Sequence, residues 1–178
     1  KPLDIVDAIK NRRSIRAFGN QPVSDQEVER LIEAARWAPS AGNIQPWAFI
    51  IVRKPKIKRG LALAALGQTF IEEAPVVIVV CADPQRSSPR YGSRGTDLYC
   101  LQDTAAATQN ILLTAQAMGL ATCWVGAFNE EEAKEVLKMP AQMRPIAIIP
   151  VGHAAETPKM RPRRPLSEII HHDTYGRK

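Results

Sequence analysis

The chain has 178 residues, of which 45% are hydrophobic and 24% charged, and its formal net charge is +6. These values are typical of a soluble globular protein, and the length favours a single domain over residues 1–178. The longest apolar runs, 74–82 and 146–151, are far shorter than the ~20 residues that span a membrane, so no membrane partner is expected. The three cysteines are widely spaced, which argues against a disulfide framework and favours a reducing, cytoplasmic setting.

Helical and extended patterns alternate in the first half of the chain. Apolar residues at helical spacing predict a helix over Pro2–Arg12, with Pro2 at its first turn. A Ser24-x-x-Glu27 capping box predicts the start of a helix over Asp25–Trp37. The other elements expected here are a strand over Trp47–Val52, helical segments over Pro55–Leu66 and Thr69–Glu73, a central β-branched strand over Val76–Cys81, and a long loop over Asp83–Thr96.

The second half contains the longest predicted helix, Leu98–Met118, which is rich in alanine and apolar on most sides. We expect it to be buried at the centre of the protein and of a dimer. After it we expect a strand over Ala121–Val125, a helix over Glu130–Leu137 capped by Asn129, a strand over Pro145–Val151, a loop over Gly152–Arg164 and a short helix over Pro165–Ile170. This mixed order predicts an α+β (mixed α/β) fold with a central sheet flanked by helices.

Six arginines are concentrated in two short segments, residues 12–16 and 161–164. This clustering favours one compact anion over a nucleic-acid duplex, and the few aromatic residues do not interleave with the basic ones. We therefore expect no nucleic-acid partner, although a basic nucleic-acid-binding module stays open as an alternative.

Several familiar chemical motifs are missing. Neither G-x-G-x-x-G nor the phosphate-binding G-x-x-x-x-G-K-[ST] pattern occurs, and there is no G-x-S-x-G elbow of a hydrolase. The only histidines are His153, His171 and His172, whose spacing predicts no metal site. Cys81 lies in an apolar strand, where a thiol behaves as a small hydrophobe. We expect no catalytic nucleophile and no catalytic general base.

Two polar groups could bind a ligand. Arg12, Ser14, Arg161 and Arg163 could form a phosphate cradle, because guanidinium forks bind phosphate bidentately. Salt bridges to nearby carboxylates are the alternative explanation of the arginines. The loop with Ser40, Asn43 and Gln45 could read the polar edge of a heterocycle, and ordinary turn hydrogen bonds are its alternative.

Five segments together resemble the flavin-dependent nitroreductase family in its short, FMN-binding form. They lie in the family's order and cover essentially the whole chain: Arg12–Phe18, Ala38–Trp47, Asp103–Gly119, Val125–Phe128 and Arg161–Leu166. The resemblance implies a single FMN-binding domain over 1–178, a central sheet flanked by helices, and an intertwined homodimer with two FMN sites at its interface. One departure is the segment Gly67–Phe70, where the family often has a residue that reaches the flavin and this chain offers Gln68.

The resemblance also implies roles for individual residues. Arg12, Ser14, Arg161 and Arg163 would hold the FMN phosphate, and Arg16 would lie at the pyrimidine edge, where it would stabilise the charge of the reduced ring. Backbone of Val125 and Gly126 would approach N5, and the loop Pro39–Asn43 would come from the other subunit. The full set of expected cofactor-binding residues is Arg12, Arg13, Ser14, Arg16, Pro39, Ser40, Ala41, Asn43, Trp124, Val125, Gly126, Arg161 and Arg163.

The implied reaction is ping-pong electron transfer. NAD(P)H would deliver hydride to flavin N5 and leave, and an electron-poor small molecule such as a nitroaromatic or a quinone would take the reducing equivalents. A heterocycle dehydrogenase or a reductive dehalogenase of the same fold is an alternative, as is a flavin-binding protein without turnover. We expect the loop Asp83–Thr96 to cover the flavin.

Overall fold

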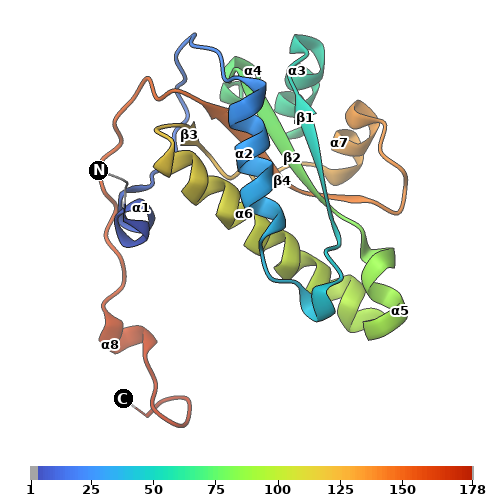
Figure 1. Cartoon of the computed structure of the whole chain (residues 1–178), viewed down its shortest axis with the longest axis vertical. Helices are drawn as coiled ribbons and strands as arrows, with labels where there is room; N and C mark the ends of the chain where they lie inside the picture. Colours follow the sequence, from blue (N-terminus) through green and yellow to red (C-terminus); the bar gives the residue numbers. More distant parts are fainter. Residues whose placement is uncertain (1–3, 178) are drawn as a thin grey trace.

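A computed structural model describes residues 4–177 and contains a mixed sheet-and-helix fold (Figure 1). Within this range the strands are β1 (Trp47–Val52), β2 (Val76–Ala82), β3 (Ala121–Thr122) and β4 (Arg144–Gly152), in the spatial order β1-β2-β4-β3. All neighbouring strands are antiparallel. The helices are α1 (Ile5–Asn11), α2 (Asp25–Arg36), η1 (Ala41–Asn43), α3 (Pro55–Ala64), α4 (Phe70–Glu73), α5 (Pro84–Arg94), η2 (Gly95–Tyr99), α6 (Cys100–Ala117), α7 (Glu130–Leu137) and α8 (Leu166–Ile169).

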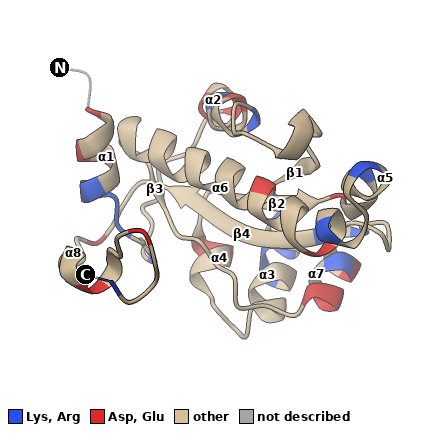
Figure 2. Ribbon diagram, turned by 90° about the horizontal axis from the view of Figure 1, so that it is seen from below, with Lys and Arg blue, Asp and Glu red and all other residues tan. Residues whose placement is uncertain are grey.

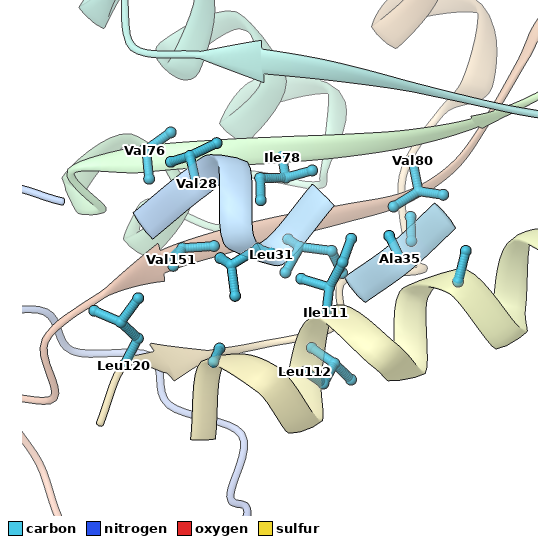
Figure 3. Packing of buried hydrophobic residues seen from close by; sticks show 14 of the residues in the cluster. Val28, Leu31, Ala35, Val76, Ile78, Val80, Ile111, Leu112, Leu120 and Val151 are labelled. Carbon is cyan, nitrogen blue, oxygen red and sulfur yellow. The ribbon is translucent and has the colours of Figure 1, made fainter. Parts of the chain in front are cut away.

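Strand β2 is the centre of the fold because helices cover both faces of the sheet. Successive side chains of a strand point to opposite faces. Val76, Ile78 and Val80 therefore pack with α2 and α6, whereas Val77 and Val79 pack with α3, α4 and α7. Figure 2 shows the two helical layers on either side of the strands, and Figure 3 shows the first cluster from nearby. The β-branched run thus forms the predicted central strand, since every residue of β2 is buried.

In a single copy of the chain, helix α6 is buried along one face and not on most sides as predicted. Its buried positions include Asp103, Ala107, Ile111 and Ala115, at spacings of four that share one face. Gln109, on another face of the helix, is exposed. Helix α6 ends with the left-handed Gly119, and the following Leu120 N–H donates to the Ala115 carbonyl at 2.8 Å, so Gly119 closes this helix as predicted.

The prediction of a long loop at residues 83–96 is wrong, because this segment forms α5 and continues into η2. The Asp83 carboxylate accepts a hydrogen bond from the Gln85 N–H at 3.1 Å, and Pro84 occupies the first turn. Pro89 and the left-handed Gly92 interrupt the helix without ending it. Because Pro, Ser and Gly usually favour loops, the local composition predicted the wrong structure.

The strand expected over Ala121–Val125 is interrupted. Residues 121 and 122 pair with β4, and pairing resumes in the same register at Val125, which bonds Ile148 in both directions at 3.0 Å. Two residues are skipped, Cys123 and Trp124, and Cys123 falls opposite Pro150, which has no N–H to donate. The prediction located the segment correctly and missed the gap.

The other boundaries differ from the expectations by a few residues. Helix α1 is described from Ile5 onward, and Pro2, its expected first residue, lies outside the described residues. The Asn129 cap of α7 is confirmed by hydrogen bonds from the Glu131 and Glu132 N–H groups. None of the helices described in residues 4–177 is both long and apolar enough to cross a membrane.

The predicted capping box of α2 is confirmed, and it leads to a stability prediction. The Ser24 hydroxyl accepts from the Glu27 N–H at 3.2 Å, and the Glu27 carboxylate accepts from the Ser24 N–H at 2.8 Å. We expect Ser24→Ala to lower the free energy of unfolding by about 1 kcal/mol. Urea unfolding monitored by circular dichroism measures this, with Ser88→Ala on the exposed surface of α5 as the matched control. Equal losses in the two variants would contradict the role of the cap.

Candidate functional site

A basic cavity of about 940 Å³ lies where the end of α1 meets the extended C-terminal segment. Five arginines, two lysines and one carboxylate contribute to its wall. The lining residues are Ile9, Lys10, Arg12, Arg13, Ser14, Arg16, Glu156, Pro158, Lys159, Met160, Arg161 and Arg163. The structure therefore brings together the two arginine segments that lie some 145 positions apart in the sequence. Basic positions at the end of α1 and in the segment after it appear in blue in Figure 2.

Backbone pairing holds these two segments side by side. Residues 14–19 run between β3 and the segment after β4: the Ile15 N–H donates to the Thr122 carbonyl at 3.0 Å, and the Gly19 N–H donates to the His153 carbonyl at 2.9 Å. The Glu156 carboxylate accepts from the backbone N–H groups of Arg16 and Ala17. This carboxylate is thus used to fix the backbone of the first arginine segment.

The arginines of the cavity have no carboxylate partner within salt-bridge distance among the described residues. Arg13 and Arg163 donate only to nearby backbone carbonyls. The Nη1 atom of Arg12 is buried and has no hydrogen-bond partner in the described chain. Burial lowers the pKa of the Arg12 guanidinium, and repulsion from Arg163 and Arg13 lowers it further.

These contacts argue against the salt-bridge explanation for the arginines of the cavity. A buried donor without a partner costs free energy, so an arrangement of this kind is expected to receive an acceptor from a ligand. The salt-bridge alternative describes Arg164, which pairs with Glu168 at 3.1 Å. Arg164 also does not line the cavity.

The loop Pro39–Asn43, which we expected to hydrogen-bond the polar edge of a heterocycle, lies away from the basic cavity, at the beginning of α6. The Ala41 N–H donates to Asp103 Oδ1 at 3.0 Å, whereas Ser14 pairs with Thr122 beyond the end of α6. Helix α6 has 18 residues and is therefore about 27 Å long. Figure 1 shows α1 and α5 at its opposite ends. In one copy of the chain, Pro39, Ser40, Ala41 and Asn43 do not line the basic cavity.

Hydrogen bonds within this loop match the turn alternative. The Gln45 N–H donates to Ser40 Oγ at 3.0 Å, and the Gln45 side-chain amide donates to Asn43 Oδ1 at 3.2 Å. Gly42, Asn43 and Gln45 all have positive φ angles, and two of them are not glycine. Such conformations persist only where the surrounding structure holds them.

Asp103 holds the loop, and it was missed in the sequence analysis. It is the only charged residue of α6, and this isolation was the available signal. The side chain is buried, its Oδ2 atom has no partner among the described residues, and burial raises the pKa of the carboxyl while the Ala41 N–H opposes that rise.

The raised pKa of Asp103 predicts a dependence of stability on pH. A carboxyl whose pKa is higher in the folded state adds stability below its unfolded pKa of about 3.9 and loses it as pH rises through the folded value. Asp103→Asn keeps an oxygen for Ala41 and cannot ionise. We expect the stability of the unmodified protein relative to this variant to be greatest below the unfolded pKa and to fall as pH rises through the folded value. Urea unfolding across a pH series measures it, and a constant difference would contradict the prediction.

The third group of expected cofactor-binding residues, Trp124, Val125 and Gly126, follows β3. Val125 is buried and paired with Ile148, whereas Trp124 (37% exposed) and Gly126 are exposed. A Cβ added at Gly126 would meet only Trp124 Nε1, at 3.8 Å. The chain itself thus leaves room beside Gly126. Gln68 lies next to this segment, since its amide donates to the Ala127 carbonyl at 3.2 Å.

The described residues contain no group of three or more His, Cys, Asp or Glu side chains placed to hold a metal ion. The basic cavity lies at one end of α6 and the hydrogen-bonding loop at the other. Both are built on an antiparallel sheet between two helical layers, which is an α+β fold.

Comparison with known sequences identifies the family. A model of the nitroreductase family matches residues 9–73 and 62–153. An FMN reductase (NADPH) from Bacillus subtilis is 31% identical over 184 residues, covering 96% of this chain and 74% of that protein. An NADH dehydrogenase from Thermus thermophilus is 30% identical over 195 residues, covering 94% and 95% of the two chains. The chain belongs to the nitroreductase family.

The solved structures agree with this assignment. The NADPH:FMN oxidoreductase from Vibrio harveyi, solved in complex with NAD⁺, matches with a TM-score of 0.89 at 26% identity. The match covers 98% of this chain and 79% of the Vibrio protein. The predicted mixed fold with a central sheet and the resemblance to the nitroreductases are confirmed.

Proposed function

We propose that this protein is an FMN-dependent oxidoreductase that passes reducing equivalents from NAD(P)H to an electron-poor small molecule by a ping-pong mechanism. The observation that carries the proposal is the basic cavity, where the buried Arg12 Nη1 has no partner in the described chain. The relatives named FMN reductase and NADPH:FMN oxidoreductase support the identity of the cofactor and of the reductant.

The residues of the cavity fit the phosphate of FMN. Arg12, Arg161 and Arg163 supply cationic forks, and Ser14 supplies a hydroxyl. Arg16 lines the same cavity and would place a fixed charge beside the electron-rich edge of the ring. When bound, FMN supplies the two-electron chemistry, and the residues of the chain bind and orient it.

A second copy of the chain completes this proposed site. The loop Pro39–Asn43 lies at the far end of α6 from the cavity, so a loop that contacts the same flavin would come from a partner. Large apolar side chains of α1, of α8 and of the residue after α8 are exposed in the single chain, which is unusual for a surface that meets only water: Ile5, Val6, Ile9, Leu166, Ile169 and Ile170. Helix α8 also extends away from the remainder of the chain (Figure 1).

The acceptor we propose is a nitroaromatic or a quinone. The one carboxylate that lines the basic cavity, Glu156, accepts from the backbone N–H groups of Arg16 and Ala17, so the proposed transfer of electrons and hydride assigns no catalytic role to it. The exposed side chain of Trp124 and the exposed Gly126 leave open surface at the third group of expected residues, where a flat acceptor could approach.

The visible spectrum of the purified protein tests the proposal. We expect a flavin spectrum, or its appearance on adding FMN, and bleaching by NADH or NADPH without oxygen. Colour should return when a nitroaromatic or a quinone is added. Bleaching that only another acceptor class reverses would favour a heterocycle dehydrogenase or a dehalogenase, and a flavin that no reductant bleaches would indicate binding without turnover. A protein that takes up no FMN would refute the proposal. The alternative of a basic nucleic-acid-binding module would then be favoured.

A further inference from the structure

A second cavity, of about 490 Å³, lies between the 43–48 segment and the start of α5. Amides, one carboxylate, one guanidinium and an apolar wall line it, contributed by Asn43, Ile44, Gln45, Trp47, Ala48, Asp83, Arg86 and Met143. It shares no lining residue with the basic cavity, and α5 lies at the other end of α6 from α1 (Figure 1).

Two arginines of α5 meet this loop without a strong partner: Arg86, which lines the cavity, and Arg90, which does not line it and lies one helical turn further along α5. Arg86 donates to the Ile44 carbonyl and Arg90 donates to the Gly42 carbonyl, each at the long distance of 3.5 Å. Neither pairs with a carboxylate among the described residues. By contrast, five arginines elsewhere form carboxylate pairs at 2.5 to 3.1 Å, namely Arg36, Arg53, Arg144, Arg164 and Arg177. The two guanidiniums therefore keep most of their donors available.

Helix α5 lies close against the 40–45 loop. A Cβ added at Gly42 would lie 2.6 Å from Tyr91 Oη and 2.7 Å from Arg90 Nη1, so the ends of these two side chains lie against the backbone at Gly42. At the other side of the helix, a Cβ at Gly95 would lie 2.7 Å from the Ser87 carbonyl. Two arginines one helical turn apart on a packed helix share one face. They can therefore converge on one anion with little loss of side-chain freedom.

We infer that Arg86 and Arg90, with the amides of Asn43 and Gln45, bind a phosphate monoester, and that its source is the 2′-phosphate of NADPH. The inference rests on the proposed function. In the proposed dimer the 39–43 loop contacts the flavin bound by the second copy. An NADPH molecule stacked on that flavin could therefore extend its 2′-phosphate into this cavity. Arginines near a ribose select the 2′-phosphate in dinucleotide-binding proteins of another fold by the same chemistry.

The other lining residues are compatible with such a ligand. Asp83 is the one carboxylate of the wall, and it is engaged in capping α5 through the Gln85 N–H. Trp47, Ala48 and Met143 supply an apolar surface of the kind that a ribose or an adenine can cover. Inorganic phosphate would bind the same guanidiniums, so the two sources of the anion need separate measurements.

Calorimetry with the oxidised, flavin-loaded protein tests the inference without turnover. We expect NADP⁺ to bind roughly tenfold or more tightly than NAD⁺, and the double variant Arg86→Gln/Arg90→Gln to lose that preference. The matched control is Arg30→Gln/Arg59→Gln, which removes two exposed arginines on α2 and α3 that have no carboxylate partner in the described chain. The control should keep the preference, and the flavin absorbance of both variants shows that the cofactor site is intact.

A titration with inorganic phosphate separates the outcomes. One outcome is that NADP⁺ and NAD⁺ bind equally while phosphate binds the unmodified protein and not the α5 variant. This result would support the phosphate site and would show that the 2′-phosphate of NADPH is not its ligand. Equal behaviour of the α5 and control variants toward both NADP⁺ and phosphate would overturn the inference. Because phosphate binding needs no flavin, a protein that takes up no FMN would refute the proposed function and leave this titration interpretable.

Discussion

Replacing Arg12 by methionine is expected to lower the affinity for FMN about 100-fold, which corresponds to the loss of hydrogen bonds to a charged group. Methionine keeps the apolar stem of the side chain and removes only the guanidinium. In the flavin-free protein the same change removes a buried donor without a partner and its repulsion with Arg13 and Arg163. We therefore expect the flavin-free variant to be as stable as the unmodified protein, or more stable.

The opposite signs of these two effects distinguish ligand binding from misfolding. Flavin fluorescence titration gives the dissociation constant, and thermal unfolding of the flavin-free protein gives the stability. Arg59→Met, on the exposed surface of α3, is the matched control and should change neither by much. A variant of Arg12 that retains FMN but unfolds more readily would show that the guanidinium serves the fold, and the proposed phosphate site would have to be abandoned.

The second large effect is expected in the core, where Leu31→Ala should lower the free energy of unfolding by about 3 kcal/mol. Leu31 is 0% exposed and lies in the cluster between α2, α6 and the sheet (Figure 3). Truncating it removes buried methyl groups and leaves a cavity that the neighbouring side chains fill only in part. Because the 39–43 loop follows α2 directly, the loop should also lose protection from hydrogen exchange.

The same substitution at Leu63 serves as the control, because this side chain of α3 is 67% exposed. Urea unfolding of both variants at one temperature compares them directly, and Leu63→Ala should cost less than about 0.5 kcal/mol. Similar losses in the two variants would mean that the α2–α6 contact does not carry the stability assigned to it here.

Local patterns were enough to predict much of the fold. The β-branched run of β2 predicted the central strand, because only a strand covered on both faces is apolar at every position. The Ser24 and Asn129 caps located two helices, since their side-chain bonds involve residues only two or three positions away. The two arginine segments were also recognised as one group, and the structure places them around one cavity.

The remaining features depend on contacts between distant residues. Helix α5 packs against the 40–45 loop through Tyr91 and Arg90, and this tertiary contact outweighs the loop-favouring composition of residues 83–96. The break in β3 depends on Pro150, a residue of the neighbouring strand. The role of Asp103 depends on the Ala41 N–H, 62 positions away. None of these partners is visible from the local sequence alone.

The three cysteines have a practical consequence for measuring how two copies of the chain associate. Cys81, Cys100 and Cys123 are buried and free, and burial raises the pKa of each thiol, that of Cys81 to about 12. A thiolate is the reactive form, so these side chains should react slowly with maleimides near neutral pH. A single cysteine introduced on the exposed surface would then be the main labelling site without removal of the native ones. Spin labels attached there would report whether the proposed dimer forms and how far apart its two copies lie.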